Sequence, residues 1–319
     1  MEKRKLGYTD MEFTVIGLGT WAIGGGGWIF GWGPQDDRDS IDTIRESIDL
    51  GINWVDTAAV YGLGHSEEIV GKAVKGLRDK VFIATKCGRK WRGSDQIYGD
   101  LSAKSIRREM EDSLKRLNMD YVDLYQIHWP DPDDQIEEAW EEMAKLKEEG
   151  KTRYIGVSNF SVEQMKRIQK IHPIASLQPK YNILNPDIEK DILPFCGENN
   201  IGVVVYSPMA SGFLTGKYTR EKISSLPEND WRTFRNLDFQ EPKLTRNLKV
   251  VEIMKDIGKK YDITPSQIAI AWVLRRSEVT SAIVGARRPG QMRENISGAS
   301  VPKSVLDEFV KRLEEENLV

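Results

Sequence analysis

Residues 121–157 read YVDLYQIHWPDPDDQIEEAWEEMAKLKEEGKTRYIGV and contain one strand–helix–strand unit. The β-branched and apolar stretch Tyr121–Ile127 predicts a strand, and Tyr154–Val157 predicts the next one. Between them, Gly150 ends a helix whose apolar side chains share one face. These side chains belong to Ile136, Ala139, Trp140, Met143 and Leu146. Two strands joined through a helix are typical of a parallel sheet.

The same unit recurs along the chain. Beyond the pair above, short apolar runs predict strands at Val15–Leu18, Ile52–Val55, Val81–Ala84, Ala175–Gln178, Val203–Tyr206 and Ala282–Val284. Helical periodicity fills the intervals, and Pro186–Phe195 is predicted to be the helix after the sixth strand. Eight parallel units can close into a (β/α)8 barrel, whereas an open doubly wound sheet, which has the same periodicity, is the alternative.

We therefore predict an α/β fold, a (β/α)8 TIM barrel that residues 1–319 form as a single domain. An N-terminal β-hairpin would precede the barrel, and a long irregular segment from Pro208 to Pro242 would follow strand seven. Extra C-terminal helices come next. One of them has Thr264 as its predicted N-cap and Pro265 at its first position.

Composition excludes several classes of function. The 319 residues include 46 Lys and Arg against 49 Asp and Glu, so the net charge of −3 leaves no basic surface for nucleic acid or an acidic membrane. No run approaches the roughly 18 apolar residues of a membrane span, and Met1–Lys5 leads into no apolar signal region. Cys87 and Cys196 have no CxxC spacing, as expected of reduced thiols. We therefore expect a cytoplasmic protein.

A glycine-rich motif follows the first predicted strand. Gly17-Leu18-Gly19-Thr20-Trp21-Ala22 matches the GxGxxG/A pattern of dinucleotide-binding folds, in which a helix must begin at once to face the pyrophosphate. This chain instead continues through Gly24-Gly25-Gly26-Gly27, which does not form a helix. Asp36 and Asp37 fall in a polar loop and not at the end of a second strand. The glycines are better explained as a flexible, aromatic-bearing loop above a pocket.

Polar side chains follow consecutive strands where a parallel barrel gathers its chemistry. Asp56 follows strand two, with Tyr61 five residues further on; Lys86 follows strand three, and His128 ends strand four. Each has a simpler explanation: a turn cap, a rim aromatic, a surface amine and a buried core histidine. Their recurrence at successive strand ends favours a joint function.

Together these four groups suit proton donation to a carbonyl. A phenol has a pKa of about 10, and a nearby ammonium is expected to lower it by stabilising the phenolate. A carboxylate would fix the ammonium, and an imidazole would orient the carbonyl oxygen. A metal site is not predicted, because His65, His128 and His172 lack the spacing of metal ligands.

At this point the chain resembles the aldo-keto reductase superfamily over essentially its whole length, and in particular the bacterial and potassium-channel-β-subunit-like branch. The resemblance implies a (β/α)8 barrel, NAD(P)H bound in extended form without a Rossmann domain, and the catalytic residues Asp56, Tyr61, Lys86 and His128. It is carried by the segments 54–58, Tyr61-Gly62, Thr85-Lys86, 126–129, 156–160, Gln178, Tyr181-Asn182, 206–208 and 216–218.

The resemblance also implies a cofactor site. It places Ser158, Asn159 and Gln178 on the nicotinamide carboxamide and stacks Tyr206 on the ring, while Lys217 would lie on the pyrophosphate side. The other implied cofactor contacts are Gly19, Thr20, Trp21, Asp56, Ser207, Pro208, Met209, Gly212, Gly285, Arg287, Arg288, Gln291, Glu294 and Asn295.

Arg287 and Arg288 precede the eighth helix, and two guanidiniums before a helix N-terminus suit a phosphate. We therefore expect NADPH to be preferred over NADH through its 2′-phosphate. Which of the two arginines binds it is open, because the aldose-reductase-like pattern has Lys-Ser after the strand and an Arg where Gln291 stands.

The expected substrate is a small-molecule carbonyl compound. Trp21, Tyr61, His128 and Trp129 are its predicted contacts, and an aromatic wall favours hydrophobic aldehydes, ketones or diketones. Trp28, Trp32 and Trp231 are further candidates for that wall, and the long loops after strands one and seven suggest a lid. A redox-sensing regulatory subunit that binds NADPH with little turnover is the alternative function.

Overall fold

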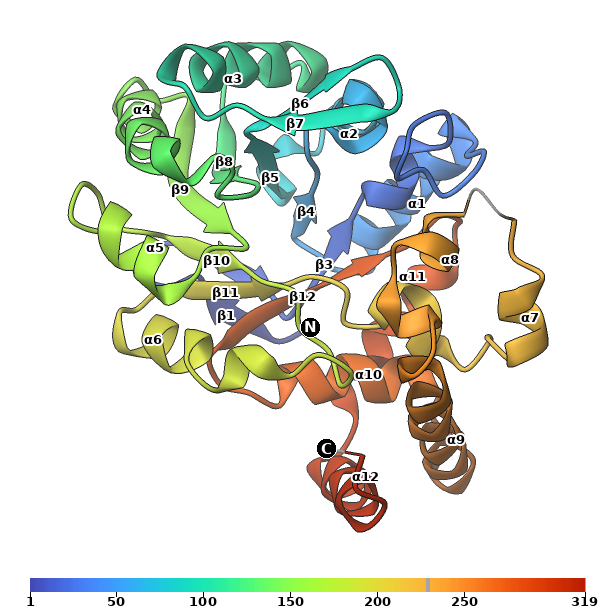
Figure 1. The fold of residues 1–319 in the computed structure, drawn as a ribbon. Helices are drawn as coiled ribbons and strands as arrows, with labels where there is room; N and C mark the ends of the chain where they lie inside the picture. Colours follow the sequence, from blue (N-terminus) through green and yellow to red (C-terminus); the bar gives the residue numbers. More distant parts are fainter. Residues whose placement is uncertain (228–229, 319) are drawn as a thin grey trace.

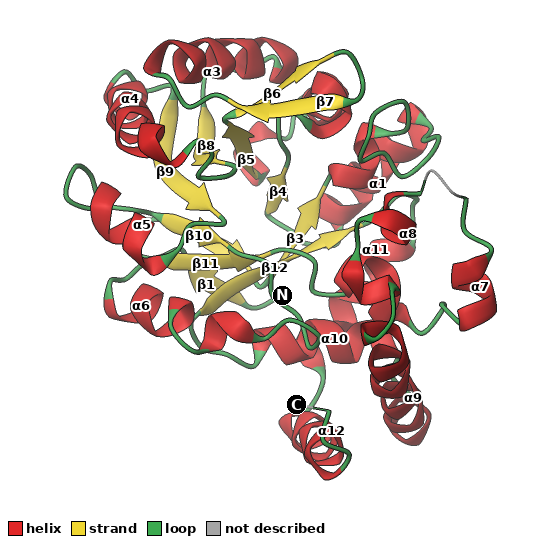
Figure 2. Cartoon of the chain, in the orientation of Figure 1, coloured by secondary structure: helices red, strands yellow, loops and turns green. Residues whose placement is uncertain are grey.

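The computed structural model describes residues 1–227 and 230–318, and its centre is a closed barrel of parallel strands with helices around the outside (Figures 1 and 2). The strand order around the closed barrel is β10-β11-β12-β3-β4-β5-β8-β9. Barrel strands that follow one another along the chain are therefore neighbours in the sheet. Closure occurs where β12 pairs with β3, with Ala282 opposite Ile16. The barrel strands are β3 (Ile16–Gly19), β4 (Trp54–Asp56), β5 (Phe82–Cys87), β8 (Val122–Ile127), β9 (Thr152–Ser158), β10 (Ser176–Gln178), β11 (Gly202–Val205) and β12 (Val279–Gly285). The predicted TIM barrel is confirmed, and the open sheet is excluded.

Helices surround the barrel as the periodicity predicted. Capping boxes begin two of them: Ser161 with Gln164, and Thr264 with Gln267, with Pro265 in the first turn of the second. Within the described ranges, no helix has both the length and the apolar character to cross a membrane. The helices are α1 (Asp37–Asp49), α2 (His65–Ala73), α3 (Ala103–Leu117), α4 (Ile136–Glu148), α5 (Val162–Ile168), α6 (Ile192–Glu198), α7 (Arg220–Ser224), α8 (Trp231–Phe234), α9 (Lys243–Tyr261), α10 (Pro265–Leu274), α11 (Gln291–Asn295) and α12 (Lys303–Glu315).

Several boundaries differ from the sequence predictions. The prediction that Asp36 and Asp37 lie in a polar loop is wrong for Asp37, where α1 begins. Asp36 does lie in the loop, where its side chain accepts a hydrogen bond from the Asp39 N–H and caps α1. The predicted helix Pro186–Phe195 is a 3-10 turn followed by α6, which begins only at Ile192. The segment from Pro208 to Pro242 is not irregular throughout, since it contains α7 and α8.

Two small hairpins lie outside the barrel sheet. The predicted N-terminal hairpin is present as β1 (Lys3–Lys5) and β2 (Glu12–Thr14). A second hairpin, β6 (Arg89–Arg92) and β7 (Gln96–Gly99), follows β5 and was not predicted, because its charged residues show no alternation of apolar side chains.

The interior of the barrel is apolar at one end. Phe13 of the N-terminal hairpin stacks on Trp54 with ring centroids 4.6 Å apart and closes that end. A Cβ at Gly17 would lie only 2.0 Å from the Trp54 ring. The first glycine of the GxGxxG-like motif therefore makes room for a core tryptophan. Polar side chains are left to collect at the other end, where the strands terminate.

Candidate active site

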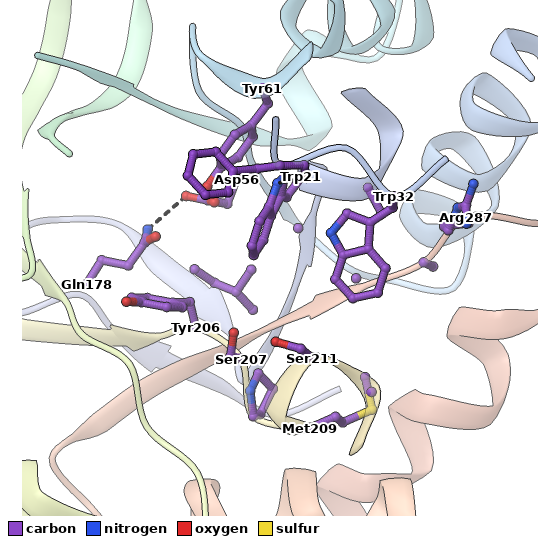
Figure 3. A pocket seen from close by; sticks show the side chains of 18 of the residues that line it. Trp21, Trp32, Asp56, Tyr61, Gln178, Tyr206, Ser207, Met209, Ser211 and Arg287 are labelled. Atoms are coloured by element: carbon purple, nitrogen blue, oxygen red, sulfur yellow. Dashed lines mark hydrogen bonds between the residues drawn. The ribbon is translucent and has the colours of Figure 1, made fainter. Parts of the chain in front are cut away.

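A cavity of about 660 Å³ opens at the carboxyl ends of the barrel strands. Its floor includes Asp56 at the end of β4 and Gln178 at the end of β10, which point toward each other across the barrel (Figure 3). Trp21 and Trp32, from the segment after β3, line the same cavity (Figure 3). The cavity lies where parallel barrels place their chemistry.

A buried ion pair forms the floor. Lys86 Nζ donates to Asp56 Oδ2 at 2.7 Å and to the backbone carbonyl of Thr57 at 2.8 Å. The same ammonium lies 3.2 Å from the Tyr61 hydroxyl oxygen. Tyr61 begins a 3-10 turn after β4, and this turn brings the phenol over the barrel. The sequence prediction that these three groups converge agrees with this geometry.

The pKa values shift differently from the simplest expectation. Burial raises the pKa of Tyr61 well above 10, and the Asp56 carboxylate raises it further. Burial also lowers the pKa of Lys86, although Asp56 partly offsets this effect. The predicted lowering of the phenol pKa is therefore wrong for this structure, because burial and the Asp56 carboxylate both favour the neutral phenol. Tyr61 is a neutral phenol, which carries the proton that a donor needs.

His128 closes the other side of the floor. Its ring packs edge-on against Tyr61, with ring centroids 5.7 Å apart and an interplanar angle of 77°. Burial lowers the pKa of His128 well below 6.5, and the charges of Lys86 and Arg89 lower it further. The imidazole is therefore neutral near pH 7 and offers a hydrogen bond without a charge.

A chain of polar contacts continues from the floor into the next strands. Gln178 Nε2 donates to Asp56 Oδ1 at 2.8 Å, and Ser158 Oγ donates to the backbone carbonyl of Gln178 at 2.8 Å. Asn159 Nδ2 bonds Ser158 Oγ, while Asn159 Oδ1 accepts from the Tyr206 hydroxyl at 2.8 Å. Asn159 adopts a left-handed φ of 63°, a conformation that asparagine tolerates better than most residues. These bonds fix two amides and a phenol ring on one wall of the cavity.

The far end of the cavity is held by a link between two distant loops. Arg287 Nε donates to Gln35 Oε1 at 2.8 Å, and Arg287 Nη2 donates to the Pro34 carbonyl at 2.6 Å. Gln35 Nε2 returns a bond to the Arg287 carbonyl at 2.7 Å. Arg288, by contrast, is exposed and does not line the cavity. The two adjacent guanidiniums therefore have different surroundings.

Most of the residues singled out in the sequence line this cavity. Thr20 does not: its hydroxyl is buried against the Asp56 carbonyl, 3.0 Å away. Lys86 and Trp231 do not line it either. Lys86 is buried beneath the floor of the cavity, and Trp231 packs on Trp21 with ring centroids 5.3 Å apart. The predicted residues that do line the cavity are Gly19, Trp21, Trp28, Trp32, Asp56, Tyr61, His128, Trp129, Ser158, Asn159, Gln178, Tyr206, Ser207, Pro208, Met209, Gly212, Lys217, Gly285, Arg287, Gln291, Glu294 and Asn295.

Sequence reasoning missed part of the lining. Arg89 and Ile97 reach the cavity from the unpredicted β6–β7 hairpin, and Phe30 reaches it from the loop after β3. The backbone N–H of Ile29 donates to the Ser94 carbonyl at 3.0 Å and ties that loop to the hairpin. The sequence does contain one signal of this hairpin, which is the unusually long connection between the third barrel strand and the third helix.

Comparison with known proteins identifies the family. A sequence model of the Aldo/keto reductase family matches residues 15–317. The chain belongs to the aldo-keto reductase family. Among aldo-keto reductases, it is 43% identical over 297 residues to the aldo-keto reductase YhdN of Bacillus subtilis (strain 168), covering 92% of this chain and 87% of that one. It is 37% identical to the NADH-specific methylglyoxal reductase of Escherichia coli (strain K12), covering 98% of each chain.

A solved aldo-keto reductase has the same architecture. The structure of the glycerol dehydrogenase AKR11B4 from Gluconobacter oxydans is similar with a TM-score of 0.86 and 37% sequence identity, covering 98% of this chain and 95% of that one. Relatives of this kind are reductases and dehydrogenases. The chain is accordingly an oxidoreductase that depends on a nicotinamide cofactor.

Proposed function

We propose that this protein reduces aldehydes or ketones to alcohols with NADPH, and that Tyr61 donates the proton. The observation that carries the proposal is the convergence of Tyr61, Lys86 and Asp56 on the floor of the cavity, with 3.2 Å between the phenol and the ammonium and 2.7 Å between the ammonium and the carboxylate. This arrangement holds a protonated phenol where a carbonyl oxygen gains negative charge.

Each residue has a separate task in this proposal. A reduced nicotinamide, when bound, supplies the hydride. Tyr61 delivers a proton to the carbonyl oxygen, and Lys86 stabilises the phenolate that remains. Asp56 compensates the buried ammonium, which would otherwise favour losing its proton. His128, neutral, hydrogen-bonds the carbonyl oxygen and orients it.

The cavity wall suits a nicotinamide cofactor. A carboxamide needs both donors and acceptors, and Ser158, Asn159 and Gln178 present both on one wall. Tyr206, held by Asn159, offers a flat face to a ring. Trp32 Nε1 is a buried donor that has no partner among the described residues and belongs to a side chain lining the same cavity. A bound polar group would satisfy it.

The preference for NADPH rests on Arg288. Arg287 is engaged with Gln35 and Pro34, whereas Arg288 is exposed beside the start of α11. The backbone N–H groups of Arg287 and Arg288 both donate to Gln291 Oε1, and these bonds fix the turn that carries the two arginines. We therefore assign the 2′-phosphate to Arg288. A relative that is 37% identical to this chain is named as NADH-specific, so membership of the family does not by itself fix the choice of cofactor.

The substrate is proposed to be a small carbonyl compound with an apolar body. Trp21, Trp28 and Trp129 line the cavity near the Tyr61 and His128 side chains. Relatives are named for methylglyoxal and glycerol, which are small molecules, and we propose that the cavity takes a compound of this size beside the cofactor. We also propose a cytoplasmic location, which the free thiols of Cys87 and Cys196 support.

The decisive experiment assays a panel of aldehydes and ketones with NADPH and with NADH, following the loss of reduced-nicotinamide absorbance. Repeated turnover of at least one compound supports the reductase. Slow single rounds with tight NADPH binding would favour the redox-sensing subunit instead. No consumption of either cofactor, in a protein that binds one of them, would overturn the proposed reaction.

A further inference from the structure

The substrate end of the cavity contains one cation that the proposed reaction does not use. Arg89 lines the cavity next to Trp129, its Cζ 5.6 Å from the centroid of the Trp129 ring. Apart from Arg89 and the reacting groups Asp56 and Tyr61, the described lining residues near His128 are apolar or neutral: Trp21, Trp28, Phe30, Val60, Ile97 and Trp129. A guanidinium in an otherwise aromatic wall would stabilise a ligand that carries a negative charge.

The β6–β7 hairpin fixes the position of Arg89. The backbone of Arg89 pairs with that of Gly99 across the hairpin. Gly99 in turn packs closely on the loop after β8, because a Cβ at Gly99 would lie only 2.0 Å from the backbone carbonyl oxygen of Asp131. Arg89 Nη1 donates to Asp131 Oδ2 at 2.6 Å. The side chain of Arg89 is only 19% exposed, whereas that of Asp131 is 58% exposed. The guanidinium is therefore held at the cavity, with its internal partner on the solvent side.

Most of the hydrogen-bonding capacity of Arg89 is unused. A guanidinium has five N–H donors in a planar fork that matches a carboxylate. In the described part of the chain, Asp131 accepts from one of them, at Nη1. The apolar side chains around Arg89 reduce screening by water, so an anion in the cavity would be attracted more strongly than on an open surface.

We propose that Arg89 binds a carboxylate on the substrate and that the preferred substrates are oxo acids in which the carbonyl and the carboxylate lie at opposite ends. This inference rests on the proposed function, because it places the carbonyl between Tyr61 and His128. His128 packs on Tyr61, and the neighbouring residue Trp129 packs on Arg89, so the two ends of the substrate would meet different residues of one segment. The aromatic wall would cover the body between them.

A matched pair of aldehydes tests the inference. 4-Carboxybenzaldehyde and methyl 4-formylbenzoate share a ring and a reacting group but differ in charge. We expect the wild-type protein to favour the acid by about tenfold in kcat/KM, chiefly through KM, as one charge-assisted hydrogen bond implies. Arg89→Gln should bring the acid-to-ester ratio close to one. Raising the salt concentration should lower the wild-type ratio.

Lys90→Gln is the matched control. It removes the same charge from the next residue of the same strand, and Lys90 does not line the cavity. Its acid-to-ester ratio should equal that of the wild type. Asp131→Asn is a second, independent variant that removes the internal competitor for Arg89. It should raise the ratio, so the inference can be tested even if Arg89→Gln does not fold.

The outcomes separate this inference from the proposed function. If no compound of the carbonyl panel, these two aldehydes included, is reduced with NADPH or NADH, the proposed function fails. If other carbonyl compounds are reduced but neither of these two is, only the role of Arg89 is overturned. If the ester is reduced and the wild type shows no preference for the acid, only the role of Arg89 is overturned. An acid preference that survives in Arg89→Gln, or that falls equally in Lys90→Gln, overturns it as well.

Discussion

Lys86 Nζ lies 2.7 Å from Asp56 Oδ2, and the two side chains are only 0% and 3% exposed. A pair this deeply buried gains its Coulomb attraction against a large loss of hydration, so it contributes little net stability while both partners are present. Removing one partner is different, because the other charge is left without compensation.

Asp56→Asn should therefore destabilise the fold by about 3 kcal/mol, the cost of an uncompensated buried charge. The free energy of unfolding from urea or guanidinium titration measures this change. Asp307→Asn is the control, because its ion pair with Lys303 is exposed and should contribute less than about 1 kcal/mol. Equal effects of the two substitutions would contradict the assignment of Asp56 as the partner of Lys86.

Tyr61→Phe should lower turnover by about 10²- to 10⁴-fold, the range that general acid catalysis contributes. The phenyl ring keeps its packing against His128 and loses only the hydroxyl that Lys86 approaches. Cofactor affinity, measured by quenching of tryptophan fluorescence, should change little. Tyr98→Phe, which removes a hydroxyl from β7 outside the cavity lining, should leave turnover unchanged. Full activity in Tyr61→Phe would exclude Tyr61 as the proton donor.

The positions of the barrel strands and of the four floor residues could be predicted because each depends on local sequence. Apolar runs end at a polar residue, and closure of a parallel barrel brings those ends together without further information. Asp56, Lys86 and His128 follow this rule directly.

The features that could not be predicted depend on contacts between distant segments. The link between Arg287 and Gln35 joins residues 252 positions apart, and no pattern near either residue indicates it. The raised pKa of Tyr61 follows from burial, which the sequence around Tyr61 does not reveal. The β6–β7 hairpin was missed for a related reason, since its residues are mostly polar and only its position over the cavity explains it.

Glu109 should make the stability of the fold depend on pH. Burial raises the pKa of Glu109 to about 7, although the Gly88 N–H donates to its carboxylate. The folded state thus holds a proton that the unfolded state releases near pH 4.5. The stability that this proton contributes is fully present below about pH 4.5 and is lost as the pH rises through 7, by about 3 kcal/mol in total.

Glu109→Gln tests this prediction, since the amide imitates the protonated carboxyl. The variant should be more stable than the wild type at pH 8 and about equally stable at pH 5, as measured by denaturant titration at both values. Glu111→Gln on the same helix is the control, because the Glu111 side chain is exposed and its pKa is lowered by Lys151. A stability difference between wild type and Glu109→Gln that is the same at both pH values would contradict the pKa shift.

Arg288→Ala should lower kcat/KM with NADPH by about tenfold or more and leave that with NADH nearly unchanged, because only NADPH carries the phosphate that a guanidinium would bind. Arg287→Ala should act differently. Its side chain holds Gln35 and Pro34 of the loop after β3, so its loss should weaken both cofactors to a similar extent. The ratio of specificity constants for the two cofactors, measured for each single variant and for the double variant, distinguishes these roles. A ratio that stays at its wild-type value in the double variant would show that neither arginine recognises the phosphate.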